Sequence, residues 1–102
     1  MKYQLVLQFA AGSKGDCERL AGLEQHLSDK LGDPAEVDGH DFGSGVFNIF
    51  VLTDTPAASF RQAHEIAIAQ GISHVMRAAY REVHGENYVI LWPASLKEFS
   101  VI

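Results

Sequence analysis

Hydrophobic and polar residues alternate at the start of the chain, where the hydrophobic positions are Tyr3, Leu5, Leu7 and Phe9. A period of two residues is typical of a β-strand. Leucines then recur at helical spacing at positions 20, 23, 27 and 31, which predicts an amphipathic helix. Asp16 suits the start of this helix, because a carboxylate stabilises the positive end of the helix dipole. We expect Gly32-Asp33-Pro34 to end it.

The middle of the chain predicts two further strands and a second helix. A short strand around Glu36 to His40 leads into the glycine-rich stretch VDGHDFGSG (37–45), and a strongly apolar strand follows over 46–53. Thr55-Pro56 has the composition of a helix N-cap followed by proline at the first helical position. The second helix is expected to bury Phe60, Ala63 and Ala67 and to end at Gly71, with Ile72 packed behind it.

The last part of the chain predicts a strand over 74–83, a hairpin turn over 84–87 and a final strand over 88–92, ended by Pro93. The order is therefore β-α-β-β-α-β with one added strand. Right-handed crossovers convert this order into a ferredoxin-like α+β fold, an antiparallel sheet with two helices on one face. The fourth strand is expected beside the first and the fifth beyond it. Other α+β topologies remain open, because connection rules alone give this strand order.

Composition narrows the range of functions. The 102 residues suffice for a single domain. A net charge of −5 argues against a nucleic-acid or anionic-membrane partner, which requires a basic surface. The single Cys17 cannot form an internal disulfide, and Gln4 and Gln8 interrupt the only candidate export signal. We therefore expect a cytoplasmic protein.

The glycine-rich stretch has two interpretations. In the first, Gly39, Gly43 and Gly45 provide positive φ angles or a bulge, so valine at Gly43 or Gly45 should cost more than about 1 kcal/mol. In the second, Asp38, His40 and Asp41 form a small metal or acid/base site. We favour the first, because turns require these residue types while metal sites usually show clearer ligand spacing. No bound metal or cofactor is expected.

Two arginines stand out in the strand predicted over 74–83. Arg77 and Arg81 are four residues apart, so their side chains should lie on the same face and could bind a carboxylate or phosphate. The alternative, which we favour, is that they pair with acidic residues on neighbouring strands or on a second subunit.

The stretch EVDGHDFGSGVFNIF, together with MKYQLVLQF, RAAYR and YVILWP, resembles a family of small uncharacterised bacterial proteins. The resemblance extends from Met1 to Pro93 and leaves the tail, 94–102, outside it. It supports the predicted fold and implies no established activity. Asn48 lies in the shared motif and joins Arg77 and Arg81 as a candidate ligand-binding residue.

Hydrophobic residues on both faces of the predicted sheet indicate self-association. Phe47, Ile49 and Val51 alternate with Val46, Phe50 and Leu52, so neither face of this strand is polar. Two helices on one face leave the other uncovered, and we predict a homodimer that packs face to face, with the tail as a candidate part of the interface. The alternative is that the tail folds back over its own sheet.

Two functions follow from these patterns. The first is a non-catalytic interaction or regulatory domain that self-associates, with a further protein partner left open. The second is a small enzyme or an anion- or metal-binding protein that uses Asp38, His40 and Asp41 together with Arg77 and Arg81. We favour the first, because the sequence has no recognisable nucleophile, cofactor loop or complete metal-ligand set.

Overall fold

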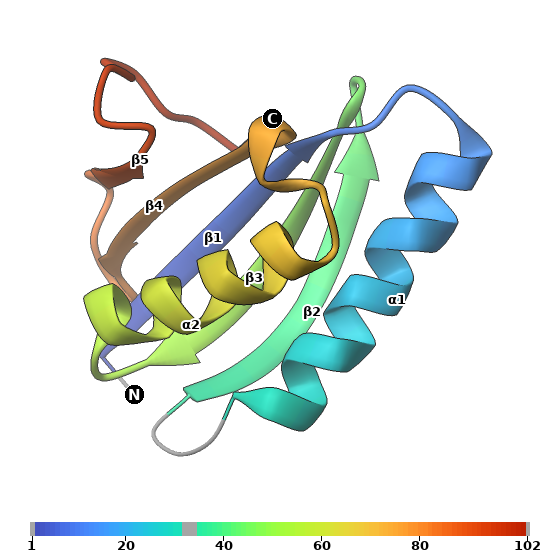
Figure 1. Cartoon of the computed structure of the whole chain (residues 1–102). Helices are drawn as coiled ribbons and strands as arrows, with labels where there is room; N and C mark the ends of the chain where they lie inside the picture. Colours follow the sequence, from blue (N-terminus) through green and yellow to red (C-terminus); the bar gives the residue numbers. More distant parts are fainter. Residues whose placement is uncertain (1, 32–34, 102) are drawn as a thin grey trace.

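The computed structural model describes residues 2–31 and 35–101 (Figure 1). Five strands and two helices follow in the predicted order, and a short 3-10 turn takes the place of the first residues of the strand predicted over 74–83. They are β1 (Tyr3–Ala10), α1 (Lys14–Lys30), β2 (Ala35–Gly43), β3 (Val46–Thr53), α2 (Pro56–Ala69), the 3-10 turn (Ser73–Val75), β4 (Met76–Glu82) and β5 (Val89–Trp92). The predicted helix stop Gly32-Asp33-Pro34 lies outside the described residues.

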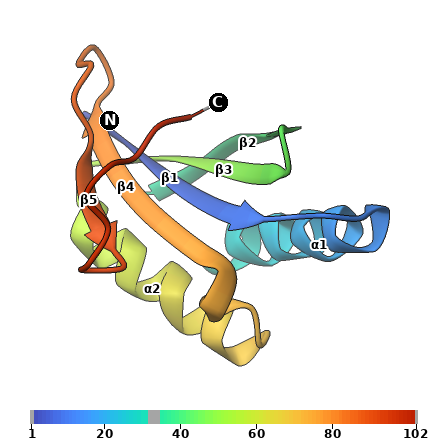
Figure 2. The same cartoon turned by 90° about the horizontal axis from the view of Figure 1, so that it is seen from above.

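The strands form one antiparallel sheet in the order β2-β3-β1-β4-β5. Both helices lie on the same side of this sheet (Figures 1 and 2). The fold is therefore ferredoxin-like with an added strand, as predicted, and β5 extends the sheet beyond β4 through a hairpin. We call the sheet face turned away from the helices the open face.

The core lies between the helices and the facing side of the sheet. The odd-numbered residues Leu5, Leu7 and Phe9 of β1 are buried there, because alternate side chains of a strand point to the same face. The leucine spacing of α1 and the small residues of α2 place the matching helix faces against them. The helical residues buried in this layer are Leu20, Leu23, Leu27, Phe60, Ala63 and Ala67. Complete burial of one leucine side chain contributes roughly 1.5–3 kcal/mol.

The two helices begin with different hydrogen-bonding groups. At α1, the Ser13 hydroxyl accepts from the Asp16 amide at 3.1 Å, and the Asp16 carboxylate accepts from the Gly12 amide at 2.9 Å. The first bond satisfies a first-turn amide that has no carbonyl partner in the helix, and the second holds the residue before the N-cap against the first turn. Asp16 therefore stabilises the helix start as predicted, through a hydrogen bond as well as through its charge.

At α2, Thr55 occupies the N-cap position and Pro56 opens the helix, as predicted. The Thr55 side chain makes no capping hydrogen bond. Instead, Thr53 Oγ1 accepts from the Thr55 amide at 3.0 Å and lies 2.8 Å from Ser59 Oγ. Thr53 and Ser59 are both buried, so the polar atoms at this helix start are satisfied inside the core.

The glycine-rich stretch forms the β2-β3 hairpin and the end of β2. Ser44 and Gly45 occupy the turn with φ angles of 54° and 77°, and Gly39, with φ 135°, lies at a register shift in β2. These positions confirm the conformational role of Gly39 and Gly45. Gly43 has no positive φ, and a Cβ atom added there would meet open space, so its predicted requirement for glycine is wrong. Gly43 precedes the turn and pairs with Val46 as ordinary strand.

Valine at Gly45 should lower the free energy of unfolding by about 1–2 kcal/mol, because a β-branched residue strongly disfavours a positive φ. The matched substitution Gly43→Val should cost less than about 0.5 kcal/mol, since surface substitutions without a special backbone angle are nearly neutral. Urea denaturation of both variants measures the difference. Equal losses of unfolding free energy in the two variants would show that the positive φ angle at position 45 is not the cause of the destabilisation.

Candidate functional site: the open face of the sheet

The tail, residues 94–101, crosses the open face (Figure 2). The Phe99 ring lies 5.1 Å from the ring of Tyr88, the residue before β5, and the Ser100 carbonyl accepts from Gln8 Nε2 on β1 at 3.0 Å. The tail therefore passes over β4 as far as β1. This is the folding back that the sequence left as an alternative, and on β3 it leaves Val46, Phe50 and Leu52 partly exposed while Asn48 is buried.

The other half of the open face keeps its apolar residues partly exposed. On β1 and β4, Val6 and Ala79 are fully buried. On β3, the open-face residues Val46, Phe50 and Leu52 are only half-buried. These three side chains, with the buried Asn48 between Val46 and Phe50, therefore form an apolar strip along β3 that remains partly accessible beside the tail. Partly exposed apolar strips on a sheet usually mark an association surface.

Polar side chains cross the open face in rows, because paired strands hold opposite residues at the same level. One row runs from β4 to β2 through Arg77, Gln8, Asn48 and Asp41. A second runs in the same direction through Arg81, Gln4, Leu52 and Glu36. We call these the charge rows, since each begins with an arginine on β4 and ends with a carboxylate on β2.

The centre of the first charge row is buried. Gln8 Nε2 donates to Asn48 Oδ1 at 3.0 Å, and neither side chain has appreciable contact with solvent. Asn48 Nδ2 is also buried and has no hydrogen-bond partner among the described residues. An unpaired buried amide donor costs about 1–3 kcal/mol, so this group lowers the stability of the single chain. The candidate residue Asn48 therefore has an unsatisfied donor that is buried beneath the open face.

The structure does not bring Asp38, His40 and Asp41 together into one cluster. His40 lies on the helix-bearing face, where its Nδ1 is 2.7 Å from Glu24 Oε1 on α1 and its ring stacks on Phe47 at 4.9 Å. Asp41 belongs to the open face, and Asp38 is the extra residue at the register shift. The described part of the chain contains no group of three side chains suited to a metal ion.

Glu24, the actual partner of His40, was missed by the sequence interpretation. It lies on another element, and no local spacing links a helix residue to a strand residue sixteen positions later. The pair is partly exposed, with 46% of the His40 side chain open to solvent, and exposed ion pairs contribute at most about 1 kcal/mol. The contact joins α1 to β2.

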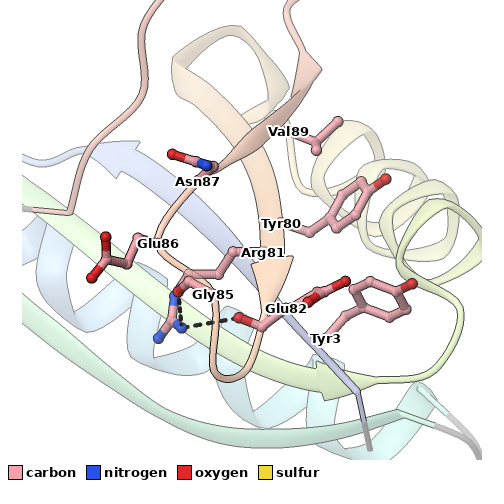
Figure 3. A pocket seen from close by; sticks show the side chains of 8 residues that line it. All are labelled: Tyr3, Tyr80, Arg81, Glu82, Gly85, Glu86, Asn87 and Val89. Carbon is pink, nitrogen blue, oxygen red and sulfur yellow. Dashed lines mark hydrogen bonds between the residues drawn. The ribbon is translucent and has the colours of Figure 1, made fainter.

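The two arginines lie on the same face, as their spacing predicted, but only one is free. Arg81 Nη1 donates to the carbonyl oxygens of Glu82, Val83 and Gly85, at 3.1, 2.7 and 3.1 Å. Figure 3 shows this guanidinium turned into the β4-β5 turn, beside a hollow of about 360 Å³. Arg81 therefore stabilises the turn. Arg77 is exposed and has no ion-pair partner within 2–31 and 35–101.

Comparisons with protein-family models, with curated proteins and with solved structures gave no match for this chain. Neither helix in the described residues is long and apolar enough to cross a membrane. The functional interpretation therefore rests on the open face itself.

Proposed function

We propose that this protein is a non-catalytic interaction module that self-associates into a homodimer through the open face. The observation that carries the proposal is the half-buried apolar strip Val46, Phe50 and Leu52 on β3, which neither helix reaches. Tail residues Phe99 and Val101 are half-buried as well and add apolar surface on the same side. Burial of apolar area is the main favourable term in association.

The alternative, a small enzyme or anion-binding protein, has less support from the geometry. An acid/base site requires its groups within hydrogen-bond reach of one reacting atom, whereas His40 and Asp41 point to opposite faces of the sheet. An anion site built from both arginines is weakened because Arg81 is bound to backbone carbonyls. We further propose a cytoplasmic location, since Cys17 is a free thiol and the fold does not depend on a disulfide that would require an oxidising compartment.

Light scattering after gel filtration tests the proposal. At micromolar concentration we expect a mass twice that of the 11.2 kDa chain. Phe50→Glu should shift the mass to that of one chain, because a carboxylate in the apolar strip would be desolvated in the dimer. A matched control is Phe42→Glu, since Phe42 is 49% exposed and lies on the helix-bearing face. Wild-type protein at the mass of one chain would refute the proposed function.

A further inference from the structure

The opposite charges at the two ends of a charge row are too far apart to form an ion pair within one chain. Arg77 and Asp41 lie three strand spacings apart, which corresponds to about 14 Å at the usual strand separation. The buried Gln8 and Asn48 pair lies between them. The open face therefore has a basic edge along β4 and an acidic edge along β2.

A second copy of the chain is complementary to this pattern in one orientation. In face-to-face packing the two-fold axis lies in the plane of the interface. An axis that runs along the strands, between β1 and β3, places β4 of one copy opposite β2 of the other. Arg77 then faces Asp41 of the partner subunit at the same level. Gln8 and Asn48 are buried within each copy, so they take no part in this pairing.

The perpendicular orientation is unfavourable. A two-fold axis that runs across the strands places β4 over β4 and β2 over β2. The basic edges then meet each other, and so do the acidic edges, and like-charge juxtaposition across an interface costs several kcal/mol. The arrangement of charges thus distinguishes two packings that would bury similar apolar surface.

The position of the tail agrees with the first orientation. Each tail covers β4 and β1 of its own sheet and leaves the β3 strip accessible. Rotation about an axis along the strands brings the tail-covered half of one copy over the uncovered half of the other. The two tails then lie side by side in the interface, and each β3 strip receives an apolar cover.

We infer that the charge rows set the geometry of the dimer: two copies pair about an axis parallel to the strands, with Arg77 facing Asp41 of the partner subunit. This inference rests on the proposed self-association. Arg77 is the residue to test, because its guanidinium is exposed whereas that of Arg81 is held by the turn.

Charge exchange tests this geometry by sedimentation velocity at low ionic strength, where ion pairs are least screened. Arg77→Glu and Asp41→Lys each create two like-charge contacts per dimer, so each variant alone should dimerise at least about tenfold more weakly than wild type. An equimolar mixture of the two variants should dimerise again, because both cross-pairs in the mixed dimer join opposite charges. The double variant in one chain should recover for the same reason.

Arg61→Glu and Glu18→Lys are the matched controls, since both residues are exposed on the helices. They should leave the dimer unchanged, and circular dichroism should show all variants folded. If both single variants dimerise as strongly as wild type, the proposed dimer geometry is wrong and the proposed self-association stands. Single variants that dissociate without recovery in the mixture or double variant would also overturn it. A monomeric wild type would instead refute the proposed self-association on which this geometry rests.

Discussion

Thr53→Val should lower the free energy of unfolding by about 2–4 kcal/mol. Valine has nearly the shape of threonine but removes the hydroxyl that accepts from the Thr55 amide and bonds to Ser59 Oγ. The buried Ser59 hydroxyl would lose this partner, at a cost of about 1–3 kcal/mol, and the Thr55 amide at the start of α2 would lose its acceptor, at a net cost of about 0.5–1.5 kcal/mol. Urea denaturation at a fixed protein concentration measures the change.

Thr55→Ala is the control for this prediction. The sequence pattern assigns the capping role to Thr55, and a capping threonine loses about 0.5–2 kcal/mol when it is replaced by alanine. Because the Thr55 side chain makes no capping bond, we expect a loss below about 0.5 kcal/mol. A larger loss for Thr55→Ala than for Thr53→Val would restore the sequence-based assignment and contradict the hydrogen bonds described above.

The second large effect should arise at the buried amide pair of the open face. Gln8→Met should destabilise the protein by about 2–3 kcal/mol, because Asn48 Oδ1 loses its donor while Asn48 Nδ2 already lacks a partner among the described residues. The bond to the Ser100 carbonyl is lost as well, which loosens the tail.

The double variant Gln8→Met with Asn48→Val should recover most of this loss. When both partners of a buried hydrogen bond are replaced by apolar groups of similar size, the net change is often close to neutral. A double-mutant cycle from urea denaturation should therefore give a favourable coupling of at least about 1 kcal/mol. All variants need the same protein concentration, because association raises the apparent stability. Additive losses would show that the two side chains act independently.

The sequence predicts the elements of this fold well because their signals are local. Alternation in β1 and leucine spacing in α1 depend on neighbours a few residues away, and right-handed crossovers restrict how such elements connect. Local patterns do not reveal which of two nearby residues of the same type has a given structural role. Gly43 and Gly45 differ only in their position relative to the turn, and Thr53 and Thr55 only in which side chain faces Ser59.

The features of the candidate site depend on strand register, which the sequence does not give. Arg77, Gln8, Asn48 and Asp41 come from four strands, and they become a row only when each strand pair has a fixed offset. The register shift before Gly39 also matters, since it decides which β2 side chains face the helices. Because the sequence does not reveal this shift, it could not predict on which face of the sheet Asp38 and His40 lie.

The central position of β1 has a consequence for synthesis of the chain. Among the five strands of the sheet, β1 leaves the ribosome before its two neighbours, β3 and β4. A nascent chain therefore carries β1 with both edges unpaired until β3 forms, and with one edge unpaired until β4 emerges. Unpaired strand edges are prone to pair with other chains. A chaperone that shields strand edges would act on this protein mainly in that interval, before residues 76–82 complete the centre of the sheet.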